Sequence, residues 1–132
     1  MRRFKFAKLV RDKIVPDIIE VGNVPNYRIL QDQEYLNELK KKLIEETTEI
    51  LNSNQDDLLK ELADIQEIID CLLEALNISK GEIDLIKEKK KEKWGSFKKR
   101  FFIDSVDAEE NSEYTKYYLS EPDKYPEDAN LS

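Results

Sequence analysis

Four carboxylates in the middle of the chain have the residue types and the spacing to bind a metal ion. Glu46 and Glu49 lie three positions apart within "EETTEI", and Glu61 and Asp64 lie three positions apart within "ELADIQEIID". Residues at this spacing are neighbours on one side of an α-helix, with Cβ atoms roughly 5–6 Å apart. Two such helices packed as a hairpin would bring the two acidic pairs face to face.

The register of these acids distinguishes them from ordinary surface charge. Position 46 continues an apolar helix stripe, yet it holds a glutamate. The stripe consists of Leu36, Leu39, Leu43 and Ile50. On the next helix Glu61 and Asp64 flank Leu62 and Ile65. Because 39% of the chain is charged, acids without such a register are read as solvated, namely Glu45, Asp57, Glu67 and Glu74.

Carboxylates gathered in this way need electrostatic compensation. At an effective dielectric near 20, each pair repels by about 3 kcal/mol at roughly 5–6 Å. Three compensations are open: some acids have raised pKa values, lysines reach in, or a divalent cation binds among them. Mg²⁺ suits an all-oxygen ligand set, with Mn²⁺ as a substitute, and it leaves coordination positions for water and phosphate oxygens.

The composition excludes several other chemistries. The chain has no histidine, so it contains no Ser-His-Asp or Cys-His system, no HExxH zinc site and no Glu-x-x-His di-iron motif. Its three glycines are too few and too scattered for a phosphate-binding loop. Hydrolytic chemistry would therefore depend on carboxylates, lysines or a hard metal ion.

The elements that would position the acids are helices. Apolar periodicity predicts helices over about residues 33–51 and from residue 55 or 56 to 76, and the "NSNQD" turn makes them antiparallel neighbours. The second is apolar on more than one side, which indicates a central position against a second subunit. We expect an all-α fold, an antiparallel helical bundle completed by oligomerisation into a dimer or tetramer.

Shorter elements flank this pair. A first helix should end at Gly22 and either start near Pro16 or be kinked there. A later helix should start with Ser79 as N-cap and Glu82 in the capping box, and stop at Gly95. The alternation in "RRFKFAKL" and in residues 98–103 favours a small two-stranded β element.

Charge divides the chain into two regions. Residues 104–132 carry the whole net charge of −7 and form an acidic tail with tyrosines and prolines, expected to be peripheral or partly disordered. Residues 1–103 are neutral overall and form the expected working domain. The chain has no apolar run long enough to cross a bilayer, no apparent secretory signal and a single cysteine. We therefore expect a cytoplasmic protein without membrane contacts.

Three segments together resemble a known family. "EETTEI" with "ELADIQEIID" resembles the Glu-x-x-Glu and Glu-x-x-Asp signature of the MazG-type all-α nucleoside triphosphate pyrophosphohydrolases, which include phosphoribosyl-ATP pyrophosphohydrolase and dimeric dUTPases. "KLVRDKIVPDIIE" is similar to the start of small phosphoribosyl-ATP pyrophosphohydrolase-like members. "KEKWGSFKKRFFI" is similar to their Lys-rich segment before a short strand. The resemblance covers about residues 8–103.

The resemblance implies a function and a set of site residues. It implies Mg²⁺-dependent hydrolysis of a nucleotide to its monophosphate and pyrophosphate by an assembly of subunits, with non-standard nucleotides among the candidate substrates. The metal ligands would be Glu46, Glu49, Glu61 and Asp64, and Glu49 is our choice for orienting or deprotonating the water. The phosphates would meet basic residues, namely Arg11, Lys13, Lys91 and Lys93.

One departure from the family pattern concerns substrate binding. Where the family has Arg-Gly-Gly, this chain has Trp94, Gly95 and Ser96, so an indole replaces a phosphate-binding guanidinium. Trp94 has two readings, a platform for a nucleotide base or an aromatic residue that packs a helix end on the bundle.

Two other functions stay open beside the enzyme. The basic segment over residues 87–100 could dock nucleic acid in a non-catalytic helical module, although clustered lysines are also usual at a solvated helix C-terminus. A bundle that has lost catalysis could instead serve as an assembly partner. Under the enzyme reading we expect a nucleotide substrate and no nucleic-acid partner.

Overall fold

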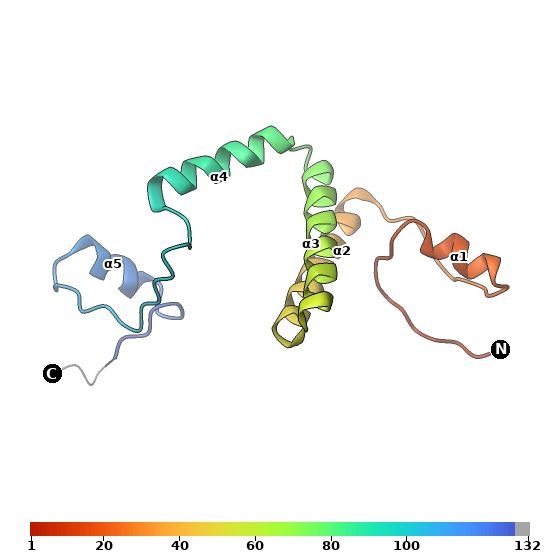
Figure 1. Ribbon diagram of the computed structural model, residues 1–132, viewed down its shortest axis with the longest axis horizontal. Coiled ribbons are helices and arrows are strands. Elements are labelled where there is room, and N and C mark those ends of the chain that lie inside the picture. Colours follow the sequence, from red (N-terminus) through yellow and green to blue (C-terminus); the bar gives the residue numbers. More distant parts are fainter. Residues whose placement is uncertain (129–132) are drawn as a thin grey trace. The chain divides into compact units, whose positions relative to one another are not determined.

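The protein consists of helices joined by irregular segments. The computed structural model describes residues 1–128 (Figure 1). The helices in chain order are α1 (Ile14–Glu20), α2 (Asp32–Glu49), the 3₁₀ turn η1 (Ile50–Asn52), α3 (Gln55–Ala75), α4 (Lys80–Trp94) and α5 (Glu113–Ser120). The chain divides into two compact units, Met1–Lys93 and Trp94–Ser132. The expected all-α class is confirmed.

The two-stranded β element predicted from the sequence does not form. Neither the N-terminal segment nor residues 98–103 is a strand, and residues 1–128 contain no strand at all. The aromatic side chains that suggested alternation lie in solvent, with Phe4 69% and Phe101 85% exposed. A two-stranded ribbon without a buried face is marginal in water, which explains why alternation alone was misleading here.

Helices α2 and α3 pack along each other as a hairpin (Figure 1). The chain reverses through η1 and the two residues after it, and Asn54 caps α3 by accepting a 2.9 Å hydrogen bond from the Asp57 amide. Leu39 of α2 and Ile68 of α3 are buried. The short connection thus produces the expected antiparallel pair, whereas the wider bundle and its oligomerisation stay predictions.

The end of α3 is formed by a Schellman motif at Asn77. The Ile78 amide donates to the Leu73 carbonyl oxygen at 2.8 Å, and the Asn77 amide donates to the Glu74 carbonyl oxygen at 3.0 Å. Asn77 has a positive φ of 56°, a conformation that asparagine tolerates better than most residues. This turn redirects the chain into α4.

Helix α4 begins with the capping box predicted from the sequence. The Glu82 amide donates to Ser79 Oγ at 3.1 Å, and the Ser79 amide donates to Glu82 Oε1 at 3.4 Å. The helix ends at Trp94, and Gly95 follows with a φ of 82°. The sequence therefore located both ends of α4.

Helix α1 shows whether Pro16 lies near a helix start or at a kink. It starts at Ile14, which places Pro16 in the first turn, where the backbone amides have no intrahelical partner. Pro16 therefore costs no helical hydrogen bond and no kink is needed. Gly22 follows the C-cap residue with a φ of 86°, as the sequence predicted.

The second unit contains a helix that the sequence analysis did not predict. Ser112 caps α5 by accepting a 3.1 Å hydrogen bond from the Thr115 amide. Four tyrosine rings gather on this unit with centroid separations of 4.9 to 6.4 Å between neighbours, namely Tyr114, Tyr117, Tyr118 and Tyr125. Eight residues are too few to show a helical period, which is why the segment read as irregular.

None of the helices in residues 1–128 is long and apolar enough to cross a membrane.

Candidate functional site

Helix α2 places Glu46 on its packing face. Glu46 is half-buried on the same side as the predicted stripe, in which Leu39 is buried and Leu36, Leu43 and Ile50 are half-buried. Its neighbours Glu45 and Glu49 are exposed. The predicted register of Glu46 is therefore confirmed, and Glu49 lies at the solvent side of the same helix, in its last position before η1.

Helix α3 turns both of its candidate acids partly inward. Glu61 and Asp64 are half-buried on the face that carries Ile68. Leu62, the apolar residue that follows Glu61 in the sequence, is 42% exposed. Since α3 packs against α2, Asp64 lies within electrostatic reach of Glu46.

The surroundings of Glu46 disfavour its ionised form. Burial raises the pKa of Glu46, and the nearby carboxylates of Asp64 and Glu49 raise it further. Lys42, one helix turn away, acts in the opposite direction. A raised pKa and a neighbouring lysine are two of the three compensations left open by the sequence.

Asp64 has a cationic partner from a distant part of the chain. Arg11, which precedes α1, places its Nη2 atom 2.6 Å from Asp64 Oδ1, across 53 residues of sequence. This hydrogen bond is the main cause of a raised pKa of Arg11. The side chains of the pair are 61% and 41% exposed, so the ion pair contributes at most about 1 kcal/mol to stability.

Glu61 has a neutral partner that the sequence analysis missed. Ser53, in the turn between α2 and α3, donates its hydroxyl proton to Glu61 Oε2 at 2.5 Å. The same hydroxyl oxygen lies 2.9 Å from the backbone carbonyl oxygen of Glu49. The sequence identified Ser53 only as a turn residue, because it does not show which side chain a loop hydroxyl will hydrogen-bond.

The four acids fit a divalent cation by their chemistry. They offer only carboxylate oxygens, Asp64 and Glu49 repel the charge of Glu46, and Asp64 already pairs with the Arg11 guanidinium. Within residues 1–128, no three acidic or cysteine side chains lie close enough together to coordinate one ion. Asp64 and Glu61 have Arg11 and Ser53 as partners instead, so ligation would require both side chains to change partner.

The other candidate residues lie on α1 and α4. Lys13 is the N-cap residue of α1 and is exposed. Lys91 and Lys93 are in the last turn of α4, where the helix dipole favours cations. Trp94 ends this helix, and its side chain is 72% exposed. The binding of phosphates or a base by these residues stays a prediction.

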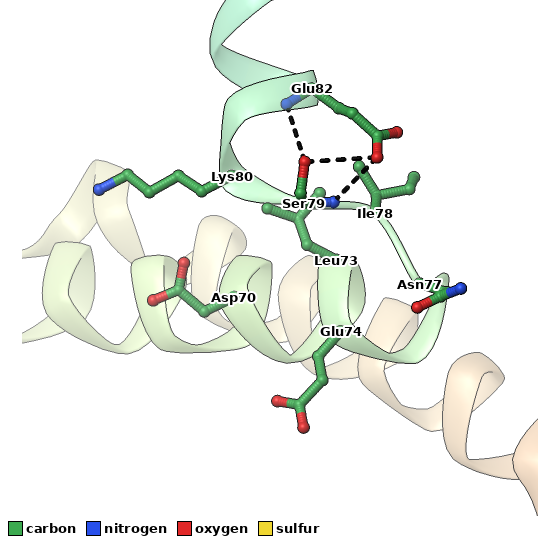
Figure 2. Close-up of a pocket in the computed structure, with 8 residues that line it drawn as sticks. All are labelled: Asp70, Leu73, Glu74, Asn77, Ile78, Ser79, Lys80 and Glu82. Atoms are coloured by element: carbon green, nitrogen blue, oxygen red, sulfur yellow. Dashed lines mark hydrogen bonds between the residues drawn. The ribbon is translucent and has the colours of Figure 1, made fainter.

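A hollow of about 560 Å³ lies at the opposite end of α3 from the turn with α2. Figure 2 shows it around the junction of α3 and α4, with the Ser79–Glu82 capping box among its walls. Its lining residues are Asp70, Leu73, Glu74, Asn77, Ile78, Ser79, Lys80 and Glu82. The four candidate ligands do not contribute to it. This size would accommodate a small molecule, yet the polar groups of the capping box are already paired.

Cys71 lies in a second hollow, of about 370 Å³, between α2 and α3. Burial raises the pKa of the Cys71 thiol, and burial also raises the pKa of the Tyr35 hydroxyl beside it. A thiol with a raised pKa is a poor nucleophile at neutral pH, which agrees with a packing role for Cys71.

The acids of the α2–α3 hairpin and their partners are thus the residues of this protein that could carry out chemistry. Comparison of the chain with protein-family models, with curated proteins and with solved structures finds no match.

Proposed function

We propose that the protein is a Mg²⁺-dependent nucleotide pyrophosphohydrolase that cleaves a nucleoside triphosphate, or a related nucleotide, to its monophosphate and pyrophosphate. Removal of non-standard nucleotides is the role that we assign to it. The observation that carries the proposal is the position of Glu46, half-buried on α2 and within reach of Asp64 on α3. The family resemblance of the acidic motifs supplies the substrate class.

Each candidate residue has a defined task under this proposal. When bound, Mg²⁺ neutralises the triphosphate and lowers the pKa of the attacking water. The four acids, Glu46, Glu49, Glu61 and Asp64, would hold the ion. Glu49 is exposed at the end of α2, where it can accept a proton from water or orient it.

The substrate would be held by basic and aromatic side chains. Arg11 pairs with Asp64, so its guanidinium lies at the edge of the proposed site. Lys13, Lys91 and Lys93 are exposed and would contact phosphate oxygens. Trp94 would stack on the base. These contacts would fix the anhydride for attack by water.

We further propose that the working protein is a homo-oligomer, a dimer or a tetramer. Several apolar side chains of α3 lie in solvent, namely Leu59 (62% exposed), Leu62 (42%), Ile69 (39%) and Leu76 (48%). Three of them recur every seven residues and so share one face of the helix, which suits a partner subunit. Light scattering measures the mass in solution, and a particle of one 15.6 kDa chain would contradict this part of the proposal.

The enzymatic proposal is tested by pyrophosphate release. A panel of ordinary and damaged nucleotides is incubated with the protein, with and without Mg²⁺, and the products are identified. We expect Mg²⁺-dependent turnover of at least one nucleotide. The double variant Glu49→Gln with Asp64→Asn should abolish it, whereas Glu45→Gln, an exposed neighbour, should keep it. Unchanged turnover in the double variant would refute the site assignment.

A second candidate function is nucleic-acid binding by the segment over residues 87–100. The observation that favours it is that every residue from 84 to 100 is exposed, including the lysines of α4. This reading predicts salt-sensitive retention of RNA or DNA without nucleotide hydrolysis. Hydrolysis without retention would exclude it.

A further inference from the structure

Arg11 places its positive charge beside one of the candidate metal ligands. The residues around it, 8–10, are irregular, and α1 begins only at Ile14, so a segment without helical constraint carries the guanidinium to α3. There Nη2 lies 2.6 Å from Asp64 Oδ1. Asp64 is also one of the three carboxylates that raise the pKa of Glu46. The positive charge thus lies beside Asp64, one of the four candidate ligands.

We infer that Arg11 is an exchangeable counter-ion, which stabilises Asp64 in the absence of a divalent cation and leaves when the cation binds. This inference rests on the proposed function, because it assumes that Asp64 is a metal ligand. A Mg²⁺ ion sits roughly 2.1 Å from its ligand oxygens. An ion bound at Asp64 Oδ1 would therefore lie within about 4–5 Å of the guanidinium, where two cations repel.

The exchange is feasible because the ion pair is exposed. With side chains 61% and 41% exposed, both groups stay hydrated when they separate. Glu61 poses less of an obstacle, since its partner is the neutral Ser53 hydroxyl and a carboxylate can accept further bonds on its other oxygen. Arg11 is thus the group that competes with a cation for this cluster.

The released guanidinium would then become available to the substrate. Arginine binds phosphate in a bidentate manner, and a nucleotide that arrives with its metal ion brings phosphates to the same place. Metal binding would free Arg11 for the phosphates, and phosphate binding would keep Arg11 away from Asp64. The two ligands would therefore favour each other's binding, a reciprocal coupling. The role of Arg11 is one of positioning and competition rather than of catalysis.

The chain offers a matched control for Arg11. Arg28 forms an ion pair with Glu34 in the first turn of α2, and its side chain is exposed as well. Removal of Arg28 changes the net charge by the same amount, but it leaves the acidic cluster and Asp64 untouched. Any effect of total charge on cation binding would appear equally in both variants.

The test is a calorimetric titration of Mn²⁺ into the full chain without nucleotide. Relative to the wild type, Arg11→Gln should bind Mn²⁺ about two- to fivefold more tightly, the range expected for loss of an exposed ion pair. Arg11→Lys, which keeps the charge, should stay near the wild type, and Arg28→Gln should not change the affinity. Equal or weaker binding by Arg11→Gln, or the same gain in Arg28→Gln, would overturn the inference.

Two further measurements separate this inference from the proposed function. Asp64→Asn should weaken Mn²⁺ binding if Asp64 is a ligand. Mn²⁺ uptake that requires Asp64 but is indifferent to Arg11 would overturn the inference and leave the proposed function standing. Absence of uptake in every protein, with and without nucleotide, together with absence of pyrophosphate release, would overturn both.

Discussion

The charge of Glu46 should destabilise the cation-free protein. Burial and three neighbouring carboxylates raise the pKa of Glu46, so the folded chain holds this side chain in an environment that disfavours ionisation. Glu46→Gln replaces the carboxylate by a neutral amide of nearly the same shape. We therefore expect this substitution to increase the free energy of unfolding in the absence of divalent ions.

The magnitude follows from the groups around Glu46. Asp64, Glu49 and Glu45 repel its charge and Lys42 attracts it. Glu49 at i+3 and Lys42 at i−4 have the spacing of helix pairs, each worth about 0.2–0.5 kcal/mol, and they roughly cancel. Burial and the charge of Asp64 across the hairpin remain, so the gain should be about 0.5–1 kcal/mol, as for an exposed charge pair. For a chain of this length that corresponds to about 2–4 °C in Tm.

The pH dependence of the free energy of unfolding shows in which direction the charge of Glu46 acts. A carboxyl group whose pKa is raised in the folded state binds its proton more tightly there than in the unfolded chain. Its contribution to the free energy of unfolding therefore falls as the pH rises from the ordinary value of 4.5 through the raised pKa, and the cost is complete above it. The advantage of Glu46→Gln should be full at about pH 7 and largely lost at about pH 4.

The assay is thermal unfolding followed by circular dichroism in chelator, at both pH values. Glu45→Gln is the matched control, because it removes the same charge from the adjacent position, which is exposed. It should change Tm by less than half as much. The reasoning would be refuted by equal Tm values for Glu46→Gln and the wild type at neutral pH, or by an equal gain in both variants.

Two other predictions concern the hairpin that carries the acids. Leu39→Ala should lower the free energy of unfolding by about 2–5 kcal/mol, because Leu39 is buried. Leu59→Ala, at a position 62% exposed, should lower it by less than about 0.5 kcal/mol in a dilute monomer. Equal losses in denaturant titrations would contradict the packing face assigned to the hairpin. Asn54→Ala removes the N-cap of α3 and should lower the free energy of unfolding by about 1 kcal/mol. Asn52→Ala, in η1, should leave it nearly unchanged. Equal helical content and equal Tm in the two variants would contradict the assignment of Asn54 as the cap.

The sequence by itself determined the features that depend on near neighbours. The C-terminal end of α1 and both ends of α4 were predicted from Gly22, Ser79, Glu82 and Gly95, because capping and positive φ are local requirements. The half-buried position of Glu46 was predicted because α2 has one clear apolar stripe and the helical period extends it to position 46.

Only the tertiary structure decided how α3 is rotated against α2 and what its acids meet. Apolar residues lie on more than one side of α3, so several rotations would bury comparable surface, and periodicity could not choose among them. The observed rotation turns Glu61 and Asp64 partly inward and leaves Leu62 in solvent. The contact between Arg11 and Asp64 spans 53 residues and follows from this rotation and from the path of an irregular segment, neither of which leaves a periodic trace in the sequence.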